Sequence, residues 1–213
     1  MVSLRRGVKG LRLGRLPKDE RNGIDAEVLA AYDRSVDALA NLGAEIVDLI
    51  LPVRFADLGA INGRIMSAEA YAALSHLVDD NAQALDQDVR PRVRAGAAIS
   101  ARDYLTALTE RERMKVSFNA AIEGLDALMT PTAVTPAIPV SSIDQNSTPA
   151  MLTRWVNFLD LCAAAVPNGF TAGGLPTSLQ IIGRTYAEPL VLRIGYAYQA
   201  AHDWHLRVPL MVT

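Results

Sequence analysis

The stretch from Thr153 to Arg184 constrains the fold more than any other part of the chain. It reads TRWVNFLDLCAAAVPNGFTAGGLPTSLQIIGR, with short apolar runs set between glycine and proline residues. Such runs are typical of strands that are buried on both faces of a sheet. We expect a helix first, then a buried strand reaching Val166, a tight connection over 167–176 and a second buried strand over 178–182. An ordinary pair of strands in an α/β core would produce the same pattern.

The remainder of the chain alternates expected strands and helices, which predicts an α/β fold. Strand, helix and strand in succession near the start favour a right-handed crossover between two parallel strands. Residues 79–96 are expected to be irregular, and the proline-rich residues 132–149 to form a long loop of the kind that borders functional sites. Strands are expected over 10–14, 44–51 and 126–131, and helices over 25–42, 55–77, 100–123 and from 189 onward.

Composition limits the classes of protein to which the chain could belong. Its 213 residues, half of them hydrophobic, predict a single α/β region over 1–213 with a substantial core. The formal net charge of −2 gives no electrostatic reason to bind nucleic acid, and no apolar run is long enough to cross a membrane. The single Cys162 makes no internal disulfide, so a cytoplasmic location is expected, with the thiol as a small buried hydrophobe.

Three ordered motifs resemble a known family. They are N-x-x-D-L-x-A-x-A-V-P-x-G-F over 157–170, G-L-P-x-x-L-Q-I-I-G-R over 174–184, and D-A-L-x-T-P-T over 126–132. Together they resemble the C-terminal half of amidase-signature hydrolases, which cleave amide or urea-type C–N bonds. Asp160 stands where other members usually carry glycine, which is similar to the allophanate-hydrolase and small-amidase branches. The resemblance implies the C-terminal portion of that fold, a mixed, mostly parallel sheet flanked by helices.

The resemblance also implies a catalytic apparatus that this sequence does not match. The family uses a lysine, a bridging serine, a nucleophilic serine and a Gly/Ser-rich loop whose N–H groups bind the oxyanion. No such loop occurs here, and Lys9, Lys18 and Lys115 lie in no matching motif. The sequence has no Walker loop, no zinc-ligand spacing and no G-x-S-x-G. We expect no catalytic residue, metal or cofactor in this chain.

The chain is therefore expected to be the substrate-side half of an enzyme that hydrolyses a small amide, inactive without the N-terminal catalytic half. Its expected partners are the small amide substrate of the parent enzyme and either that N-terminal half or a second copy. Two alternatives stay open: a non-catalytic interaction or ligand-binding protein from a split or truncated amidase gene, and a stand-alone α/β ligand-binding domain. The strand at Leu11 to Gly14 and its neighbours are expected to leave an open sheet edge and exposed apolar surface, which would favour self-association.

Four residues are candidates for the wall of a substrate pocket. Thr153 and Asn157 keep the family's spacing of four residues, which places both on one face of a helix end. Trp155 lies between them and is expected to close the cleft; the alternative is that it fills the core while Asn157 ties loop backbone together. Asn62 lies in the turn before an S-A-E-A segment over 67–70 that is similar to one in the family. The resemblance implies that this preceding turn faces substrate; the alternative is a helix that only packs on the sheet.

Two arginine positions have separate expected roles. Some family members use an arginine before a glycine to hold an acidic substrate, and either Arg94 or Arg92 would match it; a solvated loop is the alternative. Arg111 falls on the buried stripe of its helix and matches the family's Y-x2-A-x3-R pattern. We expect it to be a structural arginine with a partner.

Overall fold

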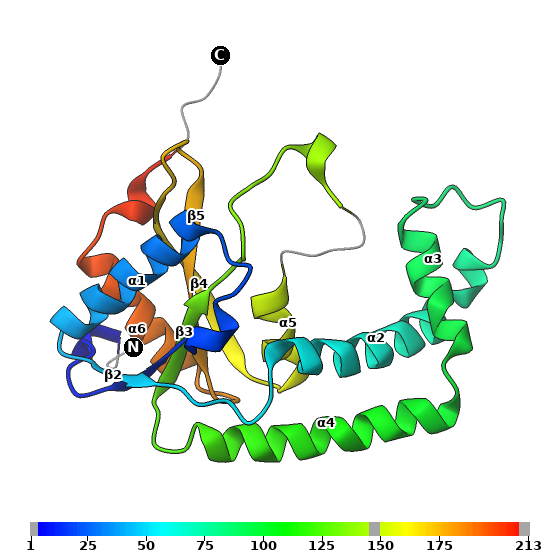
Figure 1. Ribbon diagram of the computed structural model, residues 1–213, viewed down its shortest axis with the longest axis horizontal. Coiled ribbons are helices and arrows are strands. Elements are labelled where there is room, and N and C mark those ends of the chain that lie inside the picture. Colours follow the sequence, from blue (N-terminus) through cyan, green and yellow to red (C-terminus); the bar gives the residue numbers. More distant parts are fainter. Residues whose placement is uncertain (1–3, 145–149, 209–213) are drawn as a thin grey trace.

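The computed structural model describes residues 4–144 and 150–208, which form a five-stranded sheet with helices on both faces (Figure 1). The strand order is β2-β1-β3-β5-β4. The β2–β1 and β1–β3 pairs are parallel, whereas the β3–β5 and β5–β4 pairs are antiparallel. The expected mixed α/β sheet is confirmed. The strands are β1 (Arg12–Arg15), β2 (Glu45–Asp48), β3 (Ala127–Pro131), β4 (Cys162–Phe170) and β5 (Pro176–Gly183).

The helices form two layers and an arm. Helices α1 (Ala26–Asn41) and α6 (Glu188–Ala200) cover one face of the sheet, and α5 (Met151–Phe158) lies on the other (Figure 1). Helices α2 (Phe55–Val78) and α4 (Ala101–Ala121) run side by side away from the sheet, with α3 (Val89–Arg94) near their far end. The structure therefore consists of a sheet domain and a helical arm made of α2, α3 and α4, and the two meet at α5.

The crossover at the start of the chain forms as the sequence predicts. Asp25 is the N-cap of α1, since its Oδ1 accepts hydrogen bonds from the backbone N–H of Glu27 at 2.8 Å and of Val28 at 3.2 Å. The chain then returns as β2, in parallel register with Arg12 opposite Glu45. The parallel β1–α1–β2 unit is thus confirmed.

β4 departs from the expected buried strand in two ways. Residues 167–170 continue the strand rather than begin the turn, with an irregularity in register between Pro167 and Gly169. Proline fits here because β4 is at the edge of the sheet, where a missing N–H breaks no central ladder. The side chains of Ala163 and Ala165 are exposed, so the first half of β4 is not buried on both faces.

The expectation of an irregular segment over 79–96 is wrong in part, because α3 forms within it. Asp86 Oδ1 accepts hydrogen bonds from the backbone N–H of Asp88 and Val89 just before the helix. The Arg90 guanidinium then ties the segment to the end of α2. It donates to the carbonyl oxygens of Val78, Asp80 and Gln83 at 2.6, 2.9 and 2.5 Å. Hydrogen bonds of this local kind produce no apolar periodicity in the sequence, so the pattern did not indicate α3.

The expected open edge does not lie at Leu11 to Gly14 itself, because residues 12–14 belong to β1, which lies between β2 and β3 and pairs with both. It lies at the neighbouring strand β2. Within residues 4–144 and 150–208 the edges of the sheet are β2 and β4. Of the long loop predicted over 132–149, residues 132–144 are described and carry a single 3-10 turn over 140–142; residues 145–149 lie outside the described residues.

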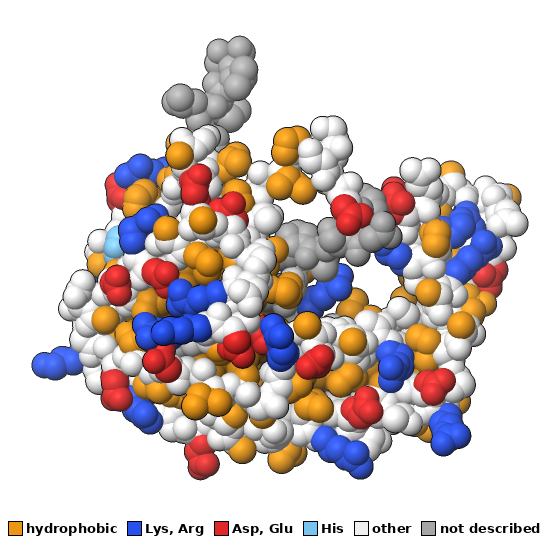
Figure 2. All heavy atoms as spheres, viewed as in Figure 1, with side chains coloured by type: hydrophobic (Ala, Val, Ile, Leu, Met, Phe, Trp, Pro, Cys, Tyr) orange, Lys and Arg blue, Asp and Glu red, His pale blue; other side chains and the backbone are white. Residues whose placement is uncertain are grey.

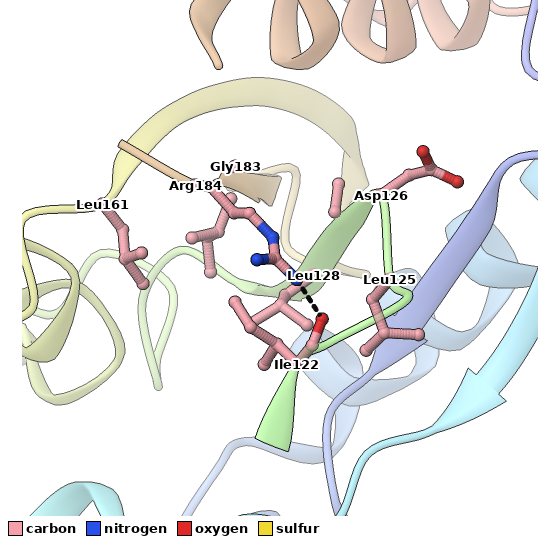
Figure 3. A pocket seen from close by; sticks show the side chains of 9 residues that line it. Ile122, Leu125, Asp126, Leu128, Leu161, Gly183 and Arg184 are labelled. Carbon is pink, nitrogen blue, oxygen red and sulfur yellow. Dashed lines mark hydrogen bonds between the residues drawn. The ribbon is translucent and has the colours of Figure 1, made fainter. Parts of the chain in front are cut away.

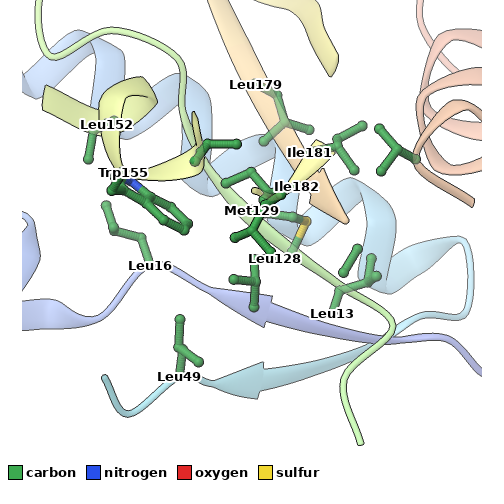
Figure 4. Packing of buried hydrophobic residues seen from close by; sticks show 14 of the residues in the cluster. Leu13, Leu16, Leu49, Leu128, Met129, Leu152, Trp155, Leu179, Ile181 and Ile182 are labelled. Carbon is green, nitrogen blue, oxygen red and sulfur yellow. The ribbon is translucent and has the colours of Figure 1, made fainter. Parts of the chain in front are cut away.

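An aromatic cluster joins the arm to the sheet domain. The Trp155 side chain is only 1% exposed and stacks on the Phe55 ring, with centroids 4.4 Å apart and planes 7° apart. The Phe118 ring tilts against the same indole at 5.4 Å. Figure 4 shows Trp155 and Leu152 pointing from α5 into the cluster beside Leu16. One side chain of α5 therefore contacts both α2 and α4.

We expect the contact between α2 and the 3-10 turn at 95–98 to tolerate no side chain at Gly96. An alanine Cβ there would lie 1.9 Å from the Ser67 carbonyl oxygen, so Gly96→Ala is expected to lower the free energy of unfolding by about 1–3 kcal/mol. Gly59→Ala is the matched control: it lies in α2 with open space around it and should stabilise by up to about 1 kcal/mol. Urea denaturation measures both, and a fully stable Gly96→Ala protein would contradict this close packing.

Candidate functional site

A cleft of about 320 Å³ opens between α2, α4 and α5. Its α2 residues are three, four and seven positions apart, so they share one face of that helix. Its floor is largely apolar and its rim carries polar and charged groups. The lining residues are Asn62, Ile65, Met66 and Glu69 of α2, Leu108 and Arg111 of α4, and Arg154, Asn157 and Phe158 of α5.

The structure brings two of the five predicted pocket residues together. Asn62 and Asn157 line the cleft from different helices. Thr153 does not; its Oγ1 donates a hydrogen bond to the Ala150 carbonyl oxygen at 3.1 Å. Trp155 does not close the cleft either, because its indole is packed between Phe55 and Phe118. Thr153 and Asn157 therefore do not both line this cleft, although they are one helical turn apart.

Arg94 lies away from this cleft, on the far part of the arm. Its Nε donates to Asp79 Oδ1 at 3.3 Å, and its Nη2 donates to Asn81 Oδ1 at 3.1 Å. Arg92 also has an interaction partner. Arg94 thus holds the segment after α2 in place, and a direct role in holding substrate remains a prediction.

Arg111 fixes one side of the cleft. Its Nε donates to the Phe158 carbonyl oxygen at 2.7 Å, and its guanidinium forms an ion pair with Asp160. Asp160 adopts a left-handed backbone with a φ of 55°, at the turn between α5 and β4. Lys115 Nζ lies 2.9 Å from Asp160 Oδ2. The expectation that Arg111 is structural and paired is confirmed, and these bonds fix the turn that follows Asn157.

The ionisable groups near this turn are poorly suited to nucleophilic or base chemistry. The hydrogen bond from Lys115 lowers the pKa of Asp160, and bonds to Asp160 and then to Glu112 raise the pKa of Lys115. Lys115 is therefore a cation and not a proton acceptor at neutral pH. Burial raises the pKa of the Cys162 thiol, whose Sγ donates to the Arg184 carbonyl oxygen at 3.2 Å. Among the described residues, no group of three or more His, Cys, Asp or Glu side chains is placed to hold a metal ion.

Sequence reasoning missed Glu69 and Arg154. Glu69 Oε1 accepts a hydrogen bond from Tyr104 Oη at 2.8 Å, which links α2 to α4 at the cleft. Arg154 lies on α5 next to the predicted Thr153 and Trp155, yet its neighbours in sequence gave no sign of where its side chain lies. The spacing of Asn62, Ile65 and Glu69 was the available signal for a shared face.

Other hollows are less suitable as sites. A cavity of about 10 Å³ among Ile122, Leu128 and Leu161 is large enough for at most one water (Figure 3). Arg184 Nη2 donates to the Ile122 carbonyl oxygen beside it at 2.7 Å, so the last arginine of the G-L-P motif has a structural role. Two wider hollows each lie on the surface of a single segment, 199–206 or the outer side of α4.

The visible surface carries charged side chains of both signs (Figure 2). Figure 2 shows acidic and basic side chains interspersed over the visible face, in keeping with the net charge of −2. Within the described ranges, no helix has the length and apolar character required to cross a bilayer.

Comparison with known proteins finds a matching family model and relatives of similar sequence. The family model described as Amidase matches residues 3–192. The A subunit of the glutamyl-tRNA(Gln) amidotransferase of Geobacter metallireducens is 34% identical, over 93% of this chain and 46% of the relative. Its counterpart in Chromobacterium violaceum is 32% identical, over 97% and 48%. The chain spans about half the length of the curated relatives it matches.

Two solved structures have a similar fold over most of this chain. A crystal structure described as an amidase is 26% identical with a TM-score of 0.82, over 92% of this chain and 46% of that chain. An allophanate hydrolase of Kluyveromyces lactis is 26% identical with a TM-score of 0.77, over 90% of this chain and 32% of that chain.

We expect Asp160→Asn to destabilise the protein in a pH-dependent way. Asparagine tolerates the left-handed backbone, so the change removes the charge alone. The folded-state pKa of Asp160 is depressed, so its contribution is present above its unfolded-state pKa and is lost as pH falls through the folded-state pKa. Because the side chain is partly exposed, the loss at pH 7 should be about 1 kcal/mol.

Urea denaturation at pH 7 and at successively lower pH measures this difference between the wild-type and Asp160→Asn proteins. The gap should close below the ordinary aspartate pKa. Glu123→Gln is the control, since it removes an exposed carboxylate that has no ion pair within the described residues, and should stay within about 0.5 kcal/mol of wild type. A gap that is independent of pH would contradict the electrostatic role of Asp160.

Proposed function

The chain belongs to the amidase family, and we propose from this premise that it forms the substrate-side half of an enzyme hydrolysing the C–N bond of a small amide. In this proposal the nucleophile, the proton acceptor and the oxyanion donors come from a polypeptide that corresponds to the other half of the relatives. The present chain contributes binding and orientation, chiefly through Asn62 and Asn157 in the cleft. We also propose a cytoplasmic location, because the single Cys162 forms no disulfide within the chain.

The open edge of β4 is the observation that carries this proposal. Within the described residues β4 pairs with β5 alone, so its other side presents unpaired N–H and C=O groups. The small side chains of Ala163 and Ala165 are exposed there and would allow another layer to pack closely. An edge of this kind is a template for a further strand. β4 begins four residues after α5 ends, so a polypeptide bound at the edge would lie near the cleft.

Tyr186 supports a partner at the same end of the sheet. It follows β5 at a point where Gly183 is paired with Cys162, the first residue of β4. Its side chain is 88% exposed, and its backbone has a φ of 62°, which is uncommon for an aromatic residue. Exposed tyrosines are frequent anchors in protein interfaces. A strained turn that presents a tyrosine beside an open strand fits a docking role.

A non-catalytic interaction or ligand-binding protein is the second candidate, favoured by the same edge and cleft together with the paired state of Lys115. The two functions differ in one outcome. A substrate-side half becomes part of an active hydrolase when the other half is supplied, whereas an interaction protein binds without turnover.

The test is complementation with the first half of the Geobacter metallireducens relative. That half is mixed either with its own second half, as the positive control, or with the present chain. We expect the present chain to form a complex on size-exclusion chromatography and to restore release of ammonia from a panel of small amides. The chain alone is expected to release none, because Lys115 is held as a cation and Cys162 as a thiol.

Two variants connect the activity to the structure. Ala163→Pro should abolish complex formation, because it removes one N–H from the open edge, whereas Ala163→Ser keeps that N–H and should leave the complex intact. Turnover by the isolated chain at the rate of the complex would refute the proposal that the catalytic groups come from the other half. Complex formation without turnover, where the positive control is active, would favour the interaction protein.

A further inference from the structure

The chain contains three asparagine–glycine pairs, and the fold places them in different surroundings. They are Asn22–Gly23, Asn62–Gly63 and Asn168–Gly169. An asparagine is chemically least stable before a glycine, because the glycine backbone nitrogen attacks the side-chain amide and no Cβ hinders its approach. In a folded protein the reaction requires that both groups be accessible and free to rotate toward each other.

The first pair lies at the centre of an exposed turn. The Ile24 N–H donates to the Arg21 carbonyl oxygen at 3.3 Å, which closes a turn with Asn22 and Gly23 in the middle. Gly23 has a φ of 80° whereas the φ of Asn22 is negative, as in a type II turn. Both residues are exposed, and apart from its chain neighbours no atom lies within 4 Å of the position that a Cβ on Gly23 would take. A reacting side chain therefore meets no obstacle here.

The two reacting groups of this pair are loosely held. Within residues 4–144 and 150–208, the Gly23 backbone N–H donates no hydrogen bond. Asn22 Nδ2 donates to the Asp19 carbonyl oxygen at 3.5 Å, which is near the limit of a hydrogen bond. The side-chain amide and the backbone nitrogen can therefore approach each other without the loss of a strong contact.

The other two pairs are fixed by secondary structure. Asn62 and Gly63 lie inside α2, where the Gly63 N–H belongs to the hydrogen-bond ladder of the helix, and Asn62 is only 9% exposed. Asn168 is 3% exposed, and its Nδ2 donates to Ser35 Oγ at 3.0 Å. Gly169 is paired with β5 in the sheet. The rotation that the reaction requires would break these contacts.

We propose that Asn22 is a site of spontaneous modification, at which the folded protein converts asparagine to isoaspartate and aspartate. The Gly23 nitrogen, after losing its proton to base, forms a bond to Asn22 Cγ. The bond from Cγ to Nδ2 breaks, and ammonia leaves after taking up a proton from solvent. Water then opens the cyclic imide: attack at the side-chain carbonyl gives aspartate, and attack at the backbone carbonyl gives isoaspartate. This inference is independent of the proposed function.

The turn joins β1 to α1, so a change in its backbone reaches the core. Isoaspartate carries the main chain through its side-chain methylene group, which lengthens the turn. The next two residues are tightly placed: Ile24 is 8% exposed and belongs to the core, and the Asp25 N–H donates to the Val134 carbonyl oxygen at 2.8 Å. Asp25 also caps α1. We therefore expect the isoaspartate form to be less stable than the original protein, and the aspartate form, which only adds an exposed charge, to be about as stable.

The test follows the three pairs by mass spectrometry while the folded protein is kept at neutral and at mildly alkaline pH. Samples are digested under mildly acidic conditions, which suppress the reaction during handling. The peptide that contains Asn22 should gain the small mass of an exchange of NH2 for OH and give two separable products. Its rate should rise in proportion to the hydroxide concentration, because the attacking nitrogen must lose its proton. The peptides that contain Asn62 and Asn168 should keep their mass.

Concentrated urea supplies the reference, because the unfolded chain exposes all three pairs and each should then react at a similar rate. Asn22→Gln should remain unmodified, since the longer side chain closes its ring much more slowly. Freshly prepared Asn22→Asp carries the charge without the lengthened backbone, so it should match the stability of the original protein in urea denaturation, whereas the isolated isoaspartate form should not. An unmodified Asn22 in the folded protein, or modification of Asn62 or Asn168 as fast as that of Asn22, would each overturn the inference.

Discussion

The packing of Trp155 sets the geometry on which the cleft depends. Its indole stacks on Phe55 of α2 and lies against Phe118 of α4, so a single side chain of α5 fixes where both long helices leave the sheet domain. Aromatic pairs of this kind stabilise beyond the area that they bury. The walls of the cleft come from these same three helices, so its shape follows from the core contact beneath it. The role of Trp155 in any site is therefore indirect.

Hydrogen bonds and ion pairs also hold α5 in position. Gln180 Nε2 donates to Thr130 Oγ1 and to the Leu152 carbonyl oxygen, both at 2.8 Å, which ties two strands to α5 inside the core. At the other end of α5, Arg111 and Lys115 hold the left-handed turn at Asp160. Several residues of the family motifs, among them Gln180 and Arg184, thus hold the scaffold together rather than face the cleft.

Local sequence patterns predicted most helices and strands close to where they lie. They did not predict which strands pair with each other in the sheet. The cap at Asp25, the apolar stripe of α1 and the proline ending β3 each leave a signal within a few residues, so these elements were expected close to where they lie. Nothing in the sequence showed that β1 is central or that Pro167 continues an edge strand, since strand order depends on contacts across the whole chain. The cleft was half predicted: Asn62 and Asn157 were named, whereas Arg154 becomes meaningful only when α5 lies over α2.

The irregularity in β4 also limits what could be added to the sheet. Regular pairing with β5 runs from Cys162 to Pro167, and Pro167 has no N–H to offer a neighbour. An incoming strand would find a regular ladder only over the first five residues, a span of about 17 Å. Such a short ladder gives one partner a defined register but gives a growing fibril little to extend. The proline thus limits how far further strands could extend the sheet from the edge at β4.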